Sequence, residues 1–456
     1  MNFISLSFWF TLALLLVLAW ILKKLIRSDR YDRWILLAMS IILFASESYV
    51  SFLIFLFIVG ITYVSLILIQ KEKFSPFVFV LSTMLTITPL LFFKYAPQGW
   101  PRLMAGELLI PIGISFYTFQ LLALVVDYRK RNTAPISGLN LLNFATFFPQ
   151  IVAGPIERKA DLMPQIEKFR FQLRGEAITE GVRFIILGFF YKLVLADNIA
   201  SISEGIHGEI THPLVIHFSN FLFGLRIYGD FCGYSLIAYG LARCLGVELK
   251  LNFLSPYTAC NIQDFWRTWH ITLSNWFRDY IYIPLGGNRT RYFGATIILV
   301  FVISGVWHGA GWNFLLWGLL HGLGIYTLIL SKKILNLPKF LSYLITMSFT
   351  CFTWLFFYQL DRSILFSKVG TIFDVPAYFQ NPVTSLKTIF GNETGLVLCL
   401  AFSVLGIGII ALEYVSSRKT GSPYGWSKSL IVQIILILTI VVMSPVADNG
   451  FVYFNF

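Results

Sequence analysis

Apolar runs alternate with short polar, basic segments along almost the whole chain. A helix of about 20 apolar residues crosses a hydrocarbon core about 30 Å thick, and most of the runs approach that length. The pattern predicts an all-α polytopic membrane protein with about 11–13 transmembrane helices. A shorter run, 139–154, is predicted to be a re-entrant or in-plane segment. The predicted spans are 6–22, 34–46, 49–70, 77–93, 108–126, 181–197, 214–245, 294–307, 313–330, 340–360, 395–414 and 430–446.

Composition supports one membrane domain over residues 1–456, with its densest polar motifs between about 145 and 325. Hydrophobic residues make up 57% of the chain and charged residues 13%, with a mean hydropathy of +0.73. A soluble protein carries about 25% charged residues. The net charge of +12 comes from basic residues at the ends of apolar runs, where membrane proteins place them. We therefore expect contacts with anionic lipid headgroups and no nucleic-acid partner.

The basic segments also predict an orientation. The first run has no basic region before it, and Lys23, Lys24 and Arg27 follow it, so we interpret it as a retained first span. Placing that first loop in the cytoplasm puts the segments 129–131, 158–174 and 243–291, and the pair Lys332 and Lys333, on the same side. Both termini are then predicted to lie on the periplasmic or extracellular side of a bacterial inner membrane. The five cysteines show no metal-binding spacing, and we expect neither a metal site nor a disulfide.

The segment 261–284 is predicted to be one amphipathic helix that ends before Pro284. Trp266, Trp269 and Trp276 fall on one face, with His270 at its edge. Arg267 and Arg278 fall towards the opposite face. The helix either lines a functional funnel or anchors the chain at the membrane interface, with His270 as a core residue.

His308 is the strongest candidate for chemistry. It lies in an apolar stretch, 293–330, that contains no acidic, lysine or arginine residue. Ionisable groups in such surroundings are by default functional candidates, and a histidine can be buried neutral and still accept a proton. Gly305 and Gly309 permit close approach, and Asn313 is a candidate to orient the ring. The alternative is a tightly packed helix hairpin with a structural histidine.

Three further polar residues carry weaker expectations. Arg226 and Asp230, four residues apart in a predicted span, are predicted to form an intramembrane pair. His321 follows His308 by thirteen residues, so the two would point to nearly opposite faces of one unbroken helix. We therefore expect His321 to be structural.

Four stretches of the chain resemble the membrane-bound O-acyltransferase family. They are similar to the bacterial polysaccharide branch, typified by the membrane subunit of alginate O-acetylation. The family's invariant histidine falls on His308, in Trp-His-Gly, and its second histidine falls on His270. The matching stretches are Phe148-Pro-Gln-Ile-Val-Ala-Gly-Pro-Ile, Asp264-Phe-Trp-Arg-Thr-Trp-His, Leu273-Ser-Asn-Trp-Phe-Arg-Asp-Tyr-Ile-Tyr-Ile-Pro-Leu-Gly-Gly-Asn-Arg and Trp307-His-Gly-Ala-Gly-Trp-Asn-Phe-Leu-Leu-Trp-Gly.

The resemblance implies helices around a central funnel and tunnel, through which a small acyl group passes from a cytoplasmic thioester donor across the membrane. Acetyl-CoA is the favoured donor, and no bound cofactor is implied. It implies a hydroxyl acceptor on an exported polysaccharide or on a periplasmic acetyltransferase partner protein. His308 would be a general base or a transient acyl carrier, assisted by His270. The implied substrate-binding residues are Trp269, Arg267, Arg278, Arg289, Trp307 and Asn313, the arginines holding donor phosphates.

Two other functions remain as alternatives. A transporter or flippase for a lipid-linked sugar or an ion fits the many spans, but no internal repeat is visible in the sequence. Within the same family, D-alanyl transfer to teichoic acid is the second alternative. The segment Gly286-Gly287-Asn288-Arg289 favours the polysaccharide branch.

Overall fold

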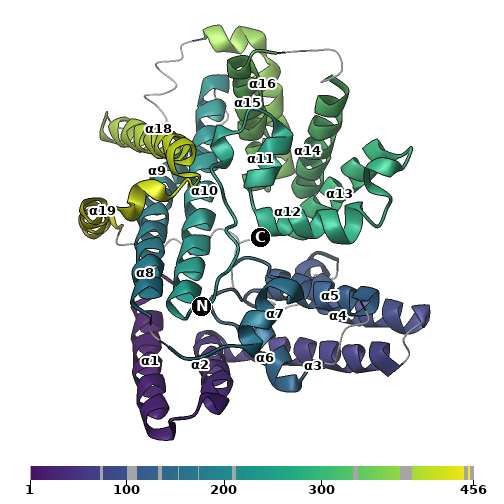
Figure 1. Ribbon diagram of the computed structural model, residues 1–456. Helices are drawn as coiled ribbons and strands as arrows, with labels where there is room; N and C mark the ends of the chain where they lie inside the picture. Colours follow the sequence, from purple (N-terminus) through teal and green to yellow (C-terminus); the bar gives the residue numbers. More distant parts are fainter. Residues whose placement is uncertain are drawn as a thin grey trace. The chain divides into compact units, whose positions relative to one another are not determined.

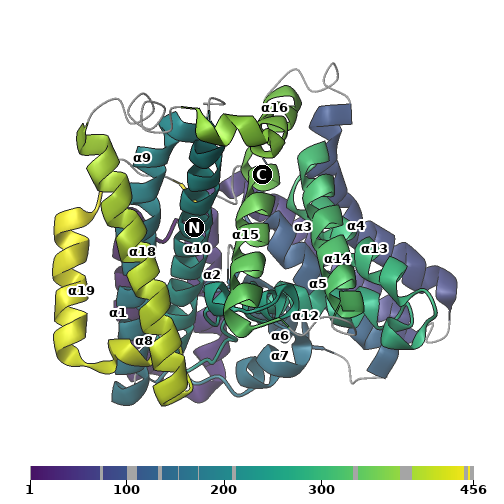
Figure 2. The same ribbon diagram turned by 90° about the horizontal axis from the view of Figure 1, so that it is seen from above.

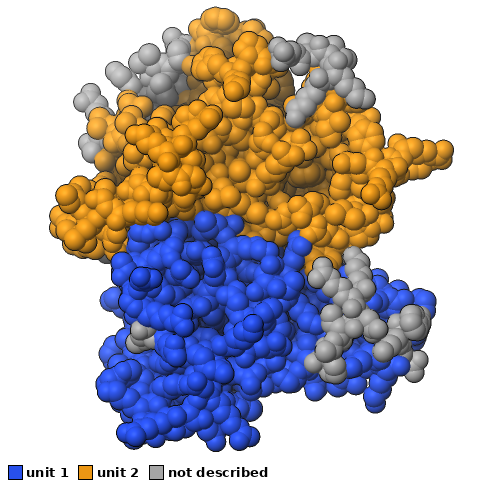
Figure 3. Space-filling view, in the orientation of Figure 1, with its two compact units in different colours: residues 1–185, 234–251 blue, residues 186–233, 252–456 orange. Residues whose placement is uncertain are grey.

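The computed structural model describes most of the chain as helices joined by turns, and none of the described residues lies in a β-strand. Lys332 and Lys333 of the predicted topology, and Val152 and Ala153 of the Phe148 motif, lie outside the described residues. The chain divides into two compact units, 1–185 with 234–251 and 186–233 with 252–456 (Figure 3). The described residues are 2–71, 75–99, 110–131, 136–151, 154–172, 174–207, 212–331, 337–380, 393–445 and 450–451.

The first unit begins with α1, whose N-terminus is capped by the Ser5 side chain. Helices α3, α4 and α5 pack side by side (Figure 1). Phe44, Phe55 and Tyr117 form edge-to-face ring pairs in its core. The helix α6 begins the segment predicted to be re-entrant or in-plane. The elements are α1 (Leu6–Ile26), η1 (Asp29–Tyr31), α2 (Asp32–Glu47), α3 (Tyr49–Lys71), α4 (Pro76–Gly99), α5 (Ile114–Arg131), α6 (Gly138–Thr146), α7 (Lys159–Glu167) and parts of α8 (Gly175–Phe189) and α10 (Pro213–Cys244).

The second unit contains both predicted catalytic histidines. Helix α14 packs beside α13 and α15 (Figures 1 and 2). The other elements are the rest of α8 and α10, η2 (Phe190–Asp197), α9 (Asn198–His207), η3 (Pro256–Thr258), α11 (Ile262–Thr268), α12 (Ile271–Phe277), η4 (Arg278–Tyr282), η5 (Gly287–Arg289), α13 (Phe293–His308), α14 (Trp312–Ser331), α15 (Lys339–Tyr358), α16 (Arg362–Phe373), η6 (Val375–Phe379), α18 (Glu393–Thr420), η7 (Gly425–Lys428) and α19 (Leu430–Met443).

Within the described ranges, seven helices are long and apolar enough to cross a membrane. Two shorter apolar helices, α13 and α19, add to them. Their outer faces carry large exposed apolar side chains, such as Leu6 at 87% and Val442 at 81% exposure, which suits lipid and not water. The architecture is therefore the all-α, multi-pass membrane fold that the sequence predicts. The seven helices are Leu6–Ile26, Tyr49–Lys71, Pro76–Ala96, Gly175–Ser203, Trp312–Ser331, Lys339–Tyr358 and Gly395–Thr420.

Candidate active site

His308 is the last residue of α13, and Gly309 ends the helix in an extended conformation. The His308 side chain is buried, with 4% exposure. Three aromatic rings meet the imidazole edge-on: Trp307 at 4.8 Å, Trp317 at 5.0 Å and Phe357 at 5.3 Å between ring centroids. The ring therefore sits in an aromatic enclosure with little access to water.

Close packing of α13 against α14 builds this enclosure. A Cβ atom on Gly305 would overlap the backbone oxygen of Phe314, and one on Gly318 would overlap the backbone oxygen of Phe301. A Cβ atom on Gly309 would overlap the Phe314 ring. Only glycine permits such an approach, so these positions bring Trp317 of α14 against His308 of α13.

His321, one of the other buried histidines, also contacts the Trp317 ring. The Trp317 ring is 5.0 Å from His308 and 4.7 Å from His321. The indole Nε1 of Trp266 donates a hydrogen bond to Nδ1 of His321, 3.3 Å away. An indole nitrogen only donates, so Nδ1 carries no proton and the neutral ring holds its proton on Nε2. Trp317 thus joins the two histidines through ring contacts, although thirteen residues separate them in the sequence.

The predicted single helix over 261–284 is wrong. The chain forms α11, then breaks at Trp269 and His270, and resumes as α12 and the π-helical η4. Trp269 is extended, and His270 has a left-handed backbone with φ of 41°. A loop residue enforces the break, because the Asn252 carbonyl accepts from the Ile271 amide at 2.9 Å and the Asn252 side chain accepts from the Thr272 hydroxyl at 2.6 Å.

The break turns His270 into the protein. Its side chain has 1% exposure and packs edge-on against Phe231 at 4.6 Å. Burial lowers the pKa of His270 to about 3, so the ring stays neutral at physiological pH. The Trp307 ring lies 6.2 Å from His270 and 4.8 Å from His308. The two predicted catalytic histidines therefore flank one tryptophan of the Trp-His-Gly motif.

Trp269 and Asn313, two of the predicted substrate-binding residues, have partners within the protein. Trp269 has 1% exposure and packs on Phe253 at 5.1 Å and Trp354 at 5.1 Å. The Asn313 amide donates to the backbone oxygen of Phe356 at 3.0 Å, which ties α14 to α15. Trp269 therefore lies in an aromatic core, and the amide nitrogen of Asn313 forms its hydrogen bond with the backbone of α15.

A pocket of about 610 Å³ opens beside this core. The α11–η4 segment gives its polar wall, with Arg267, Asn275 and Arg278, and helices α13 and α14 give its apolar wall. Arg267 pairs with Asp264 at 3.0 Å and Arg278 with Asp279 at 2.6 Å, and both guanidinium groups are exposed. The pocket also borders Trp266, the donor to His321, and Ser304, one turn before His308. Arg289 is exposed in η5 and is not among the lining residues.

Two buried polar clusters escaped the sequence analysis. Asp230 does not pair with Arg226; it pairs with Lys192 of η2 at 2.7 Å, and Asp197 also bonds Lys192 at 2.6 Å. The carboxylate of Glu413 in α18 accepts hydrogen bonds from the hydroxyls of Tyr191 and Tyr228. A lone lysine inside the predicted span 181–197 was the available signal for the first cluster.

The second cluster adjoins the histidine region through Tyr228. The Tyr228 ring lies 6.1 Å from Trp269, the residue before His270. The π-helical η2 that carries Lys192 is a feature often found at functional sites.

Among the described residues, no group of histidine, cysteine or acidic side chains has a metal-binding arrangement, and all five cysteines are free thiols.

Comparison with known proteins gives concordant matches. The sequence profile of the membrane-bound O-acyltransferase family matches residues 49–366. A peptidoglycan O-acetyltransferase of Helicobacter pylori is 32% identical over 399 residues, which cover 77% of this chain and 75% of that protein. A probable alginate O-acetylase of Azotobacter vinelandii is 36% identical over 51% of this chain and 49% of its own. A teichoic acid D-alanyltransferase of Bacillus subtilis is 29% identical over a region that covers 63% of this chain and 79% of that protein.

Proposed function

This chain belongs to the membrane-bound O-acyltransferase family, and on that premise we propose that it moves an acetyl group from a thioester donor to a polysaccharide hydroxyl, with His308 as the catalytic centre. The observation that carries the proposal is the placement of His308. It ends α13 inside an aromatic enclosure, next to Trp307 and within a motif of the family. A buried neutral imidazole accepts a proton from a hydroxyl without first losing one.

The donor side of the proposal rests on the pocket beside α11–η4. Its exposed guanidinium groups, Arg267 and Arg278, suit phosphates, and its apolar wall suits the uncharged arm of a thioester such as acetyl-CoA. Trp266 lies between this pocket and His321, in the wall that faces the histidine region. The donor would thus bind with its phosphates at the polar rim and its thioester towards α13.

The chemistry follows from the groups present. In the general-base route, His308 takes the proton of the acceptor hydroxyl as its oxygen attacks the thioester carbonyl carbon. The carbon–sulfur bond then breaks, and the proton passes to the leaving thiolate. In the acyl-carrier route, the imidazole nitrogen attacks the carbonyl carbon first, and the carbon–sulfur bond breaks to release the thiolate. The acceptor hydroxyl then attacks the acetyl-imidazole, the carbon–nitrogen bond breaks, and the hydroxyl proton passes to the thiolate. Trapping an acetylated His308 peptide would identify the second route.

The acceptor is a hydroxyl on an exported polymer or on a periplasmic partner protein, and the chain would lie in a bacterial inner membrane with both termini outside. The Helicobacter pylori relative is named for peptidoglycan and the Azotobacter vinelandii relative for alginate, which supports a polysaccharide acceptor for this chain. The Bacillus subtilis match keeps D-alanyl transfer as the second candidate. Acetyl-CoA and a D-alanyl carrier protein, offered separately as donors to purified protein, distinguish the two.

The deciding experiment compares purified His308→Ala with the wild type and with His321→Ala, at matched thermal stability. General-base assistance contributes about a hundred- to ten-thousand-fold in rate. We expect the acetyl-transfer rate of His308→Ala to fall at least about a hundredfold while donor binding is kept. The rate of His321→Ala should fall much less. Retention of more than about a tenth of the rate in His308→Ala would show that this histidine is structural. A transporter would release no thiol from acetyl-CoA.

A further inference from the structure

A second pocket, of about 390 Å³, lies within the first unit, away from the residues of the candidate active site in sequence and in unit. Three cations border it: Lys168, Arg170 and Arg174. No carboxylate is among its lining residues, and the remainder are glutamines, a glycine and apolar side chains. We propose that this basic pocket binds the phosphate headgroup of an anionic membrane lipid.

An alternating pattern aims the cations outward. In the extended segment after α7, Phe169 and Phe171 are buried, whereas Arg170, Gln172 and Arg174 are exposed. The Phe171 amide donates to the buried carboxylate of Asp32 at 3.1 Å, which holds the segment in place. Alternate side chains of an extended chain point to the same face, so Arg170, Gln172 and Arg174 lie together on the exposed face of this segment.

The other wall of the basic pocket is equally fixed. The Gln165 side chain accepts from the Glu248 amide at 2.8 Å and donates to the Glu248 carbonyl at 2.9 Å. Gly246, with φ of +79°, lies two residues after the end of α10 and leaves open space where a side chain would stand. The pocket is thus preformed by backbone geometry, so a ligand would not have to order it.

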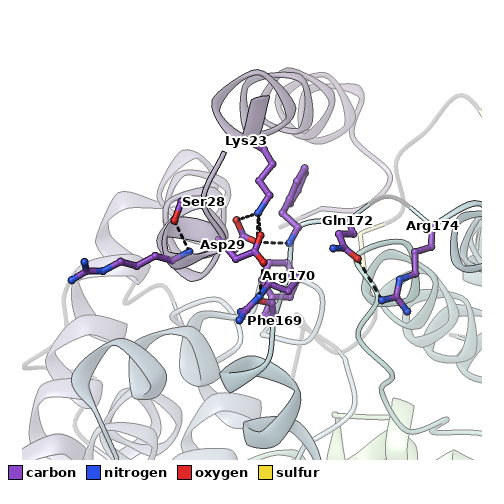
Figure 4. A network of polar contacts seen from close by, with 10 residues as sticks. Lys23, Ser28, Asp29, Phe169, Arg170, Gln172 and Arg174 are labelled. Carbon is purple, nitrogen blue, oxygen red and sulfur yellow. Dashed lines mark hydrogen bonds and ion pairs between the residues drawn. The ribbon is translucent and has the colours of Figure 1, made fainter. Parts of the chain in front are cut away.

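Charge in the basic pocket is only partly neutralised. Arg170 pairs with Asp29 at 3.2 Å, and Asp29 also bonds Lys23 (Figure 4). Arg174 reaches only the amide oxygen of Gln172, at 3.4 Å (Figure 4). Within the described ranges, neither Lys168 nor Arg174 forms an ion pair. Two exposed cations beside a cavity without acidic lining favour a net anionic ligand.

The level of the pocket identifies the source of the anion as lipid. Arg174 immediately precedes the apolar span Gly175–Ser203, and Leu245 immediately follows α10. Lys23, which shares Asp29 with Arg170, lies in the last turn of α1, another span. Ends of apolar helices mark the headgroup region, where basic side chains attract anionic lipids.

The test uses the full chain in detergent and native mass spectrometry. Wild-type protein is titrated with phosphatidylglycerol and, separately, with phosphatidylcholine. We expect phosphatidylglycerol to bind more tightly, and the double variant Lys168→Gln/Arg174→Gln to bind it about tenfold more weakly. Lys339→Gln/Lys419→Gln removes the same charge from exposed positions outside the basic pocket and should keep wild-type binding.

Three results would overturn the proposal: equal binding of the two lipids, unchanged binding in the pocket variant, or an equal loss in the control. A fourth arm tests the source of the anion. If millimolar inorganic phosphate or ADP displaces phosphatidylglycerol, the pocket takes soluble phosphates and the lipid assignment is wrong. The binding readout does not depend on acetyl transfer, so it stands or falls separately from the proposed function.

Discussion

The indole nitrogen of Trp266 donates to Nδ1 of His321 across 3.3 Å, and this hydrogen bond connects α11 to α14. Both residues are buried, so neither partner is easily replaced by water. Removing a donor from such a pair leaves a buried acceptor unsatisfied, which costs about 1–3 kcal/mol. The bond also fixes which nitrogen of His321 carries the proton.

Trp266→Phe should therefore lower the thermal stability by more than its loss of ring area accounts for. The matched control is Trp354→Phe, because no hydrogen bond from the Trp354 indole nitrogen is present within the described ranges. Thermal unfolding of both variants in detergent measures the difference, which we expect to be about 1–3 kcal/mol. Equal destabilisation of the two would mean that the Trp266–His321 bond contributes nothing.

The left-handed backbone of His270 separates its structural role from its chemical role. Asparagine tolerates this conformation better than alanine does. His270→Asn should therefore unfold at a higher temperature than His270→Ala, although both lack the imidazole. If the neutral ring assists transfer, both variants lose activity together. Recovery of wild-type turnover in His270→Asn would make His270 a backbone element only.

The two pocket arginines predict a change in donor affinity. Arg267→Gln/Arg278→Gln should raise KM for acetyl-CoA about tenfold and leave kcat nearly unchanged, since phosphate contacts far from the thioester act on binding. Arg289→Gln is the matched control, because Arg289 is exposed outside the pocket lining. Steady-state kinetics with acetyl-CoA decide the matter. A larger rise in KM for Arg289→Gln than for the double variant would mean that the donor phosphates bind at η5 and not in this pocket.

Glu157 makes a stability prediction that depends on pH. Burial raises its pKa to about 7, although its carboxylate accepts from the Lys250 amide at 2.7 Å. The stability linked to this group is fully present below its ordinary pKa of about 4.5 and is lost as the pH rises through 7. Glu157→Gln keeps an acceptor for Lys250 but cannot ionise.

The Glu157→Gln variant should therefore unfold at a higher temperature than the wild type at pH 8, and at about the same temperature at pH 4.5. Glu248→Gln, at an exposed position in the same unit, should show no such difference. A wild-type advantage at pH 8 would mean that the ionised carboxylate is stabilised where it lies.

Long, continuous patterns were predicted well from the sequence. The segment predicted at 214–245 is the helix α10, Pro213–Cys244, and the segment predicted at 294–307 is the helix α13, Phe293–His308. Apolar runs of this length predict helices reliably, because in lipid every backbone N–H and C=O group must form its hydrogen bond within the segment. The same logic made His308 a candidate, because the apolar stretch 293–330 contains two histidines and no acidic, lysine or arginine residue.

Contacts between distant segments escaped the sequence. The break at His270 depends on Asn252, and the partner of Asp230 is Lys192 rather than its helical neighbour Arg226. The Trp266–His321 bond spans 55 residues. Helical periodicity describes only one segment at a time, so it extended the 261–284 helix through a turn that another segment imposes.

The close packing of α13 against α14 at Gly305, Gly309 and Gly318 has a consequence for biogenesis. One of its tight contacts brings Gly305 against the backbone oxygen of Phe314, and these residues are only nine apart in the chain. Contacts that are local in sequence form early, because little loop entropy opposes them. We expect these two helices to assemble as one hairpin as soon as both have left the ribosome, before α15 is made. The imidazole of His308 would then be set against Trp317 while the C-terminal part of the chain is still unsynthesised.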